Sequence, residues 1–371
     1  MILRALFAVL ALSLPAQAEM QIQSVTSPGG ITAWLVEDHN IPFTALEIQF
    51  KGGTSLDTPD KRGAVNLMTA LIEEGAADMD SRAFAEARDS LAANFSFDAG
   101  TDSIGVSASF LTENRDSAIA LLQQALNAPR FDQDAVDRVR EQVLSMLRSD
   151  EKDPDTIGSQ TFDALAFGDH PYGSSGDGTL ATVAALTRDD ILAAHKGALA
   201  RDRIFVAAAG DITAAELGPL LDQLLGDLPA TGAPLPPRAD WRLPPGVTVK
   251  DFPTPQSSVL FGHVGIPRDD PDFFAAFILN EALGGGRFTA RLMSEVREKR
   301  GLTYGIGSYL VNMDQADMYL GQFSASNDKV AEAIQVLRDE WAKIGAEGIT
   351  EEELATTKTY LTGSYPLRFD G

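Results

Sequence analysis

The sequence contains no cysteine and only four histidines among its 371 residues. Without cysteine, neither a disulfide nor a thiolate metal site can form in any cellular compartment. No two histidines are three or four residues apart, the spacing that places two ligands on one face of a helix. A zinc site encoded by a local histidine motif is therefore disfavoured; the four residues are His39, His170, His195 and His263.

Positive charge is also scarce. The chain has 30 Lys and Arg against 53 Asp and Glu, so its formal net charge is −23. Such a surface repels nucleic acid and anionic lipid, and it attracts basic peptides, although soluble exported bacterial proteins often carry the same sign. A nucleic-acid partner is therefore not expected.

Long hydrophobic runs are absent after residue 18. No stretch in the rest of the chain approaches the roughly 20 apolar residues that span a bilayer. Residues 1–18, MILRALFAVLALSLPAQA, combine an early Arg4, an apolar stretch and the small-residue end Ala16-Gln17-Ala18. This pattern is typical of a secretory signal peptide. We expect cleavage after Ala18 and a periplasmic or secreted protein that does not insert into a membrane.

The chain is long enough for two domains rather than one ordinary core. Strands and amphipathic helices fill residues 19–229, and a similar pattern returns over residues 247–371. Between them, residues 230–246 concentrate proline, which is incompatible with a continuous helix or an inner strand. The sequence predicts two modules joined by a semi-rigid, extended linker.

The first module is expected to open with two strands in residues 31–53 and a turn near residues 40–42. Residues 63–76, GAVNLMTALIEEGA, predict a helix with one apolar face, and Ser81 stands at the cap position of the next helix. Further along we predict a strand, two helices divided by a proline turn, a long helical stretch and a buried strand. These lie at residues 102–111, 113–129, 131–150, up to about 196, and 202–212.

The second module repeats the first. Aligning residues 84–100 with residues 293–309, at an offset of 209, pairs Glu86 with Glu295, Arg88 with Arg297 and Phe95 with Tyr304. The second copy stops after the helix that matches residues 136–147. We expect that the C-terminal module is truncated, and the alternative is a naturally short domain. In either case its sheet lacks a strand and has an unpaired edge. The predicted elements of this copy are a strand at 257–266, helices at 272–286 and 288–301, strands at 302–310 and 316–326, and a helix at 329–346.

Three stretches together carry a family resemblance: GAVNLMTALIEEGA, FGDHPYGSSGDGT, and NEALGGGRFTARLMSEVREKRGLTYGIGSY after the proline-rich linker. In this order the chain resembles the pitrilysin/insulinase family of zinc peptidases, which includes mitochondrial processing peptidase. The resemblance covers nearly the whole chain after residue 18. It implies an α+β fold of two homologous modules, each a mostly antiparallel sheet packed with helices, which enclose a peptide chamber.

Active members of that family bind zinc through an inverted His-x-x-Glu-His motif on the helix that matches residues 63–76. The resemblance places Asn66 and Ala70 at the two histidine positions and Thr69 at the glutamate position. Asn is a poor zinc ligand, Ala is none, and Thr cannot act as a base near neutral pH. The third ligand position falls near Met146 and Leu147, so no metal is expected in this chain. We interpret Glu73 and Glu74 as a solvated helix end.

In the same family, an Arg and a Tyr seven residues apart contact substrate carbonyl groups, and these positions match Arg297 and Tyr304. A guanidinium and a phenol are hydrogen-bond donors that stabilise a developing oxyanion without binding a metal. The alternatives are a surface ion pair of Arg297 with Glu295 or Glu298, and a half-buried strand position for Tyr304. Gly284, Gly285 and Gly286 are expected to form a helix-to-helix turn that needs positive φ and close backbone approach, rather than a phosphate site.

These observations lead to a functional hypothesis. The chain is predicted to be a non-catalytic subunit of an exported, zinc-dependent heteromeric endopeptidase, inactive alone. A homologous secreted chain with His-x-x-Glu-His would supply zinc, and Arg297 and Tyr304 would bind peptide or unfolded protein there. The alternative is a peptidase-like scaffold that acts only in peptide binding or assembly. A second alternative is an independent hydrolase that uses other residues, but the sequence contains no Ser/His/Asp grouping that supports it.

Overall fold

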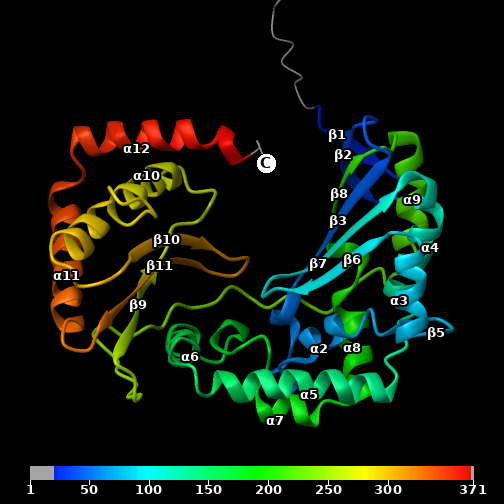
Figure 1. The fold of residues 1–371 in the computed structure, drawn as a ribbon, viewed down its shortest axis with the longest axis horizontal. Coiled ribbons are helices and arrows are strands. Elements are labelled where there is room, and N and C mark those ends of the chain that lie inside the picture. The colour runs from blue at the N-terminus through cyan, green and yellow to red at the C-terminus, as the bar shows by residue number, and fades with distance from the viewer. Residues whose placement is uncertain (1–20, 369–371) are drawn as a thin grey trace, which may run out of the picture.

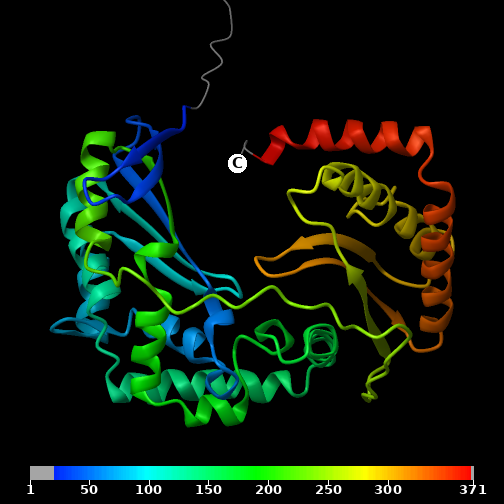
Figure 2. The same ribbon diagram turned by 180° about the vertical axis from the view of Figure 1, so that it is seen from behind.

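The computed structural model describes residues 21–368, so the predicted signal peptide lies outside the described residues. Two modules lie side by side, each a β-sheet with helices packed against it (Figures 1 and 2). The mixed α+β architecture expected from the sequence is confirmed. Within residues 21–368, no helix is long and apolar enough to cross a membrane.

The first module contains a six-stranded sheet of order β1-β2-β8-β3-β7-β6. All its neighbouring pairs are antiparallel except β2 and β8. The two strands predicted in residues 31–53 both form, but they do not pair, because β8 from much later in the chain lies between them. The strands are β1 Gln23–Thr26, β2 Thr32–Glu37, β3 Phe43–Lys51, β6 Asn94–Ala99, β7 Ser103–Leu111 and β8 Ile204–Gly210.

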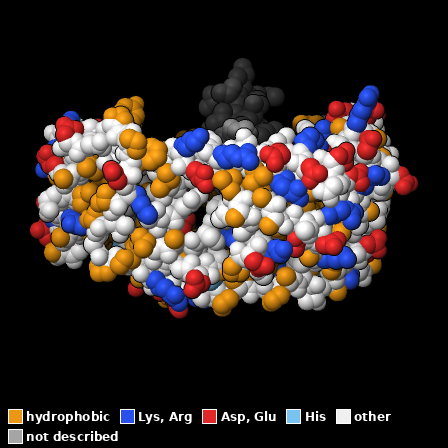
Figure 3. All heavy atoms as spheres, turned by 90° about the horizontal axis from the view of Figure 1, so that it is seen from below, with side chains coloured by type: hydrophobic (Ala, Val, Ile, Leu, Met, Phe, Trp, Pro, Cys, Tyr) orange, Lys and Arg blue, Asp and Glu red, His pale blue; other side chains and the backbone are white. Residues whose placement is uncertain are grey.

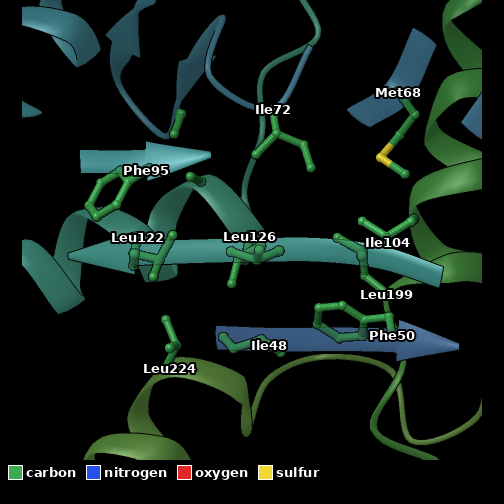
Figure 4. Packing of buried hydrophobic residues seen from close by; sticks show 14 of the residues in the cluster. Ile48, Phe50, Met68, Ile72, Phe95, Ile104, Leu122, Leu126, Leu199 and Leu224 are labelled. Carbon is green, nitrogen blue, oxygen red and sulfur yellow. The ribbon is translucent and has the colours of Figure 1, made fainter. Parts of the chain in front are cut away.

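One face of this sheet forms the main core. Alternate residues of β3 and β7 are buried, among them Ile48, Phe50 and Ile104, and Figure 4 shows them packed with Leu122, Leu126 and Leu224 from the helices behind. The opposite face is more solvated: Trp34 on β2 and Phe205 on β8 are 59% and 48% exposed. This alternation is what a half-buried antiparallel sheet requires.

The helices of the first module are α2 Ala64–Ala70, α3 Ser81–Ser90, α4 Arg115–Asn127, α5 Gln133–Asp150, α6 Pro154–Phe167, α7 Leu180–Ala185, α8 Arg188–Ala198 and α9 Ala214–Leu225. The long helical stretch predicted up to about residue 196 is wrong, because a loop at residues 168–179 separates α6 from α7. The cap prediction is also wrong by one residue. Asp80, not Ser81, accepts the backbone N–H of Ala83 at the start of α3, and a short hairpin of β4 Gly75–Ala76 and β5 Met79–Asp80 precedes it.

The second module has a three-stranded sheet of order β10-β11-β9, antiparallel throughout. This order reproduces β6-β7-β3 of the first module. The strands are β9 Gln256–Val264, β10 Ile306–Asn312 and β11 Asp317–Ser326, and the helices are α10 Phe273–Leu283, the π-helix η6 Met293–Glu298, α11 Val330–Glu347 and α12 Glu351–Ser364. The predicted strand at 302–310 begins later than expected, which leaves Tyr304 in the preceding loop.

Residues 226–255, which include the predicted linker 230–246, form neither helix nor strand, and they run between the modules (Figure 1). This segment is packed rather than free: the backbone N–H of Arg242 donates to the Ala166 carbonyl at 2.7 Å. Trp241 makes edge contacts with Phe162 and Phe167 of α6. On the face seen in Figure 3, hydrophobic side chains gather over the second module, and charges of both signs are interspersed over the first.

A small apolar cluster joins the two modules. We call it the junction cluster; it consists of Phe162, Ala166, Phe167, Tyr172, Ala316 and Met318. Tyr172 adds polar contacts, because its hydroxyl donates to Asp102 at the β6–β7 turn and accepts the Gln315 N–H at the β10–β11 turn, 3.0 Å away. Burial raises the pKa of Tyr172, so the hydroxyl stays protonated.

Candidate functional site

The start of α2 is fixed by a glycine and a buried carboxylate. Gly63 has φ of +93°, and a Cβ there would lie 2.7 Å from the Asp177 carbonyl oxygen, so the position requires glycine. The Asp57 carboxylate accepts the N–H groups of Gly63 and Val65 at 2.9 and 3.1 Å. Asp57 is buried, and this burial raises its pKa to about 6.

The three positions of the zinc motif lie on α2, as the resemblance implied. Asn66 donates its side-chain amide to Asp177 at 3.0 Å. Thr69 is buried, and its hydroxyl donates to the Val65 carbonyl one turn earlier. Ala70 is exposed. These side chains supply neither imidazole nor a carboxylate to this helix, so they do not fit zinc.

The position of the third ligand fits zinc no better. On α5, Met146 is 53% exposed and Leu147 is buried in the core. Throughout residues 21–368, no three His, Asp or Glu side chains converge in a way that could hold a metal ion.

A polar cavity of about 490 Å³ adjoins this helix. Asp177, the partner of Asn66, is one of its walls, and α6 contributes Asp155 and Asp163. Burial raises the pKa of Asp163 to about 6. Because its carboxylates do not converge on a point, we assign the cavity no metal.

Glu73 and Glu74 are not a solvated helix end, and that prediction is wrong. Both are half-buried and paired. Glu73 accepts from Arg88 at 2.9 Å, and Glu74 accepts from Ser81 at 2.6 Å and pairs with Arg138. Burial raises the pKa of Glu73 despite Arg88, so these carboxylates belong to the structure of the first module.

Arg297 and Tyr304 come together at the surface of the second module. Arg297 lies on η6, which leads into Gly301 with φ of +59°, and Tyr304 follows in the loop before β10. The guanidinium carbon lies 5.2 Å from the centre of the Tyr304 ring and 4.5 Å from that of Phe288. Tyr304 is 89% exposed, so the half-buried strand position considered for it is wrong.

The ion pairs with Glu295 or Glu298, considered as the alternative role of Arg297, do not form in the described residues. Glu295 accepts instead from Lys299 at 2.5 Å and from Arg300 at 2.7 Å. Within the part of the chain that the structure describes, Arg297 makes no ion pair and donates no side-chain hydrogen bond. Its N–H groups are therefore available to another acceptor.

The repeat supplies an internal comparison. At the matching positions of the first module, Arg88 pairs with Glu73 and Asp89, and Phe95 is only 7% exposed. The first copy is therefore built into its module, whereas the second presents an unpaired Arg and an exposed Tyr.

Phe288 was not predicted as a site residue from the sequence, because a single Phe after a glycine turn carries no signal of its own.

The glycines before Phe288 do not adopt positive φ, and that part of the prediction is wrong. The close approach predicted for this turn does occur at Gly284, where a Cβ would lie 2.0 Å from the buried Ser308 hydroxyl. Two of the four histidines have structural contacts with backbone carbonyl groups. His170 contacts the Pro237 carbonyl at 2.9 Å, and His195 is buried against the Leu126 carbonyl at 2.8 Å.

Comparison with known proteins identifies the family. Residues 32–179 match the family described as Insulinase (Peptidase family M16), and residues 185–361 match that described as Peptidase M16 inactive domain. The chain belongs to peptidase family M16. Among M16 proteins, it is 26% identical over 336 residues to the non-peptidase homolog YmxG of Helicobacter pylori, which covers 90% of this chain and 77% of that protein.

Other M16 relatives bear different names. The uncharacterized zinc protease SCO5738 of Streptomyces coelicolor is 26% identical over 353 residues, covering 92% of this chain and 76% of the relative. The crystal structure of a peptidase M16 inactive domain from Pseudomonas fluorescens superposes with a TM-score of 0.83 at 28% identity, covering 93% of this chain and 84% of that one. The predicted family and two-module fold are thus confirmed, in an M16 chain without the zinc motif.

Proposed function

We propose that this protein is the non-catalytic subunit of an exported, heteromeric M16 endopeptidase and supplies Arg297 and Tyr304 to substrate bound at a partner chain's zinc site. The partner would be a homologous secreted chain with His-x-x-Glu-His. When bound to that partner, zinc would polarise the scissile carbonyl and activate water. This chain's α2 helix does not fit zinc, so its own part is limited to hydrogen bonding.

The exposure of Tyr304 carries the proposal. A donor that is 89% exposed has no enclosing site within the described chain, so a site around it requires another molecule. Within residues 21–368, Arg297 beside it has no carboxylate partner, in contrast to its counterpart Arg88 in the first module. An exposed phenol beside a half-buried guanidinium that has no ion pair in the described residues is suited to act in trans.

Each donor has a definite chemical role in this proposal. The Tyr304 hydroxyl would donate to the carbonyl oxygen as it gains negative charge, and the Arg297 guanidinium would hold the substrate backbone. Such donors raise the rate only if they are in place before the reaction. The cation–π contacts of Arg297 with Phe288 and Tyr304 provide that placement.

The test mixes this chain with a zinc-motif M16 chain from the same organism and follows peptide cleavage. We expect the mixture to cleave much faster than either chain, and Tyr304→Phe to lower kcat on the order of 100-fold. Tyr309→Phe is the matched control, because Tyr309 is also exposed and lies on β10 nearby. Arg297→Lys should lower kcat more than Arg88→Lys does.

Two results would refute the proposal. One is a partner that alone cleaves as fast as the mixture. The other is full activity of the mixture with Tyr304→Phe, which would leave this chain a scaffold for peptide binding or assembly.

A further inference from the structure

Phe288, Arg297 and Tyr304 form one surface group, which we call the arginine stack. The three residues come from separate pieces of backbone: the segment after α10, the η6 helix and the loop before β10. Phe288 is 60% exposed. Its ring lies 4.5 Å from the Arg297 guanidinium carbon, which it helps to hold in place.

The stack leaves the hydrogen-bonding capacity of Arg297 unused. An aromatic face attracts the positive charge of a guanidinium but does not replace an oxygen acceptor, so the five N–H donors remain to be satisfied. The planar fork of these donors matches the two oxygens of a carboxylate, and it forms charge-assisted bonds that are stronger than those to a neutral carbonyl.

The first module shows what an Arg at this position binds. Arg88, the repeat counterpart of Arg297, donates to the Glu73 carboxylate at 2.9 Å. The same offset of 209 places Ala282 at the position of Glu73. The offset also places Glu298 at the position of Asp89, the other acid that pairs with Arg88, but within the described residues Glu298 makes no ion pair with Arg297. The second module therefore keeps the arginine without the Glu73 carboxylate that pairs with it in the first module.

Local charge favours an anionic ligand, against the charge of the whole molecule. Residues 287–300 carry five basic side chains and two acidic ones, a net of 5 − 2 = +3, in a chain of −23. Glu295 pairs with Lys299 and Arg300, and Glu353 pairs with Arg291. In the described residues Arg287 and Arg297 make no ion pair and both face aromatic rings. Arg287 donates to the Glu281 carbonyl and the Thr357 hydroxyl, whereas Arg297 donates no side-chain hydrogen bond there.

We propose that the arginine stack is a binding site for a peptide carboxylate, either a C-terminal carboxylate or an Asp or Glu side chain, and that Phe288 is a positioning residue for Arg297. The missing carboxylate at Ala282 would be supplied by the ligand. This inference deepens the proposed function by naming a class of substrate. It rests on that function in one respect, namely that the ligand is a peptide.

The binding test uses the full chain alone, without the zinc partner. Fluorescence anisotropy compares one labelled neutral peptide in three forms: C-terminal amide, C-terminal acid, and amide with an internal Asn changed to Asp. At low salt we expect at least one acid form to bind about tenfold more tightly than the neutral amide, and added salt to reduce the difference. The two acid forms separate the two sources of the carboxylate.

Variants assign the preference to the stack. Arg297→Gln should abolish the preference for acid, whereas Arg300→Gln removes the same charge from the same segment and should keep most of it. Phe288→Leu should weaken the preference several-fold, and Phe288→Tyr should restore it. Thermal unfolding should be nearly unchanged by the Phe288 variants because that side chain is mostly exposed.

Equal binding of the acid and amide forms would overturn the inference, as would an equal loss with Arg300→Gln. The proposed function would survive either result, since it is measured separately through cleavage by the mixed chains.

Discussion

At the scale of single residues, the same position can be structural in one module and available in the other. Arg88 and Arg297 occupy matching places, yet only Arg88 finds carboxylates within its own module. The alignment of the two copies could be made from the sequence. The difference in pairing could not, because it depends on Glu73, which the sequence indicated only as part of a solvated helix end.

Asp57 provides a residue-scale prediction of pH dependence. Its pKa rises from the ordinary value of 3.8 to about 6 on folding, chiefly through burial. Between pH 3.8 and about 6, the folded state therefore holds a proton that the unfolded chain has released. The stabilisation from this group is fully present below pH 3.8 and is lost as pH rises through about 6. The loss should be on the order of 2 to 3 kcal/mol.

The measurement is the unfolding free energy of the wild type minus that of Asp57→Asn across this pH range. Asn cannot titrate, so the difference isolates Asp57. A difference that stays constant with pH, or that grows in favour of the wild type as pH rises, would contradict the assignment.

At the scale of elements, periodicity predicted most helices and strands, but not where they pair. The alternation in residues 31–53 predicted β2 and β3, whereas the insertion of β8 between them depends on a segment more than 150 residues away. Tyr304 illustrates a local failure. Its neighbours read as a strand, but Gly301 and the Thr303 side chain, which accepts the Gly305 N–H, form a loop first.

The turn after α10 gives a prediction at this scale. Gly284→Ala would place a Cβ 2.0 Å from the Ser308 hydroxyl, which bonds with Asn280 and Tyr319 in the core of the second module. Overpacking here should destabilise the protein by roughly 1 to 3 kcal/mol, seen as a lower denaturant midpoint.

Gly286→Ala is the matched control for the turn. A Cβ at Gly286 meets nothing within 4 Å, and its φ is not positive. The control should stay within about 0.5 kcal/mol of the wild type. Equal effects of the two substitutions would show that flexibility of the turn, rather than contact with Ser308, determines stability.

At the scale of the whole molecule, the sequence predicted two modules and a proline-rich connection, but not that the connection is packed. Trp241 in that segment contacts Phe162 and Phe167 beside the junction cluster. A single Trp among prolines has no periodic pattern, so its partners on α6 could not be inferred from the sequence.

Trp241→Ala should loosen the attachment of the modules. We expect a loss on the order of 2 kcal/mol, below the value for a fully buried Trp, and a broadened or divided unfolding transition in calorimetry. Trp34→Ala on the open sheet face is the control and should leave one transition. An undivided, unshifted transition for Trp241→Ala would show that the modules are held together elsewhere.

Tyr172 helps to fix the distance between the two modules. One phenol oxygen contacts the turn regions of both sheets, Asp102 on one side and Gln315 on the other, and the ring is packed in the junction cluster. The spacing between α2 and the surface around Arg297 is therefore set by contacts within this chain. In the function proposed above, the partner chain would have to match that spacing, so the fit between the two chains would depend on geometry as well as on surface chemistry.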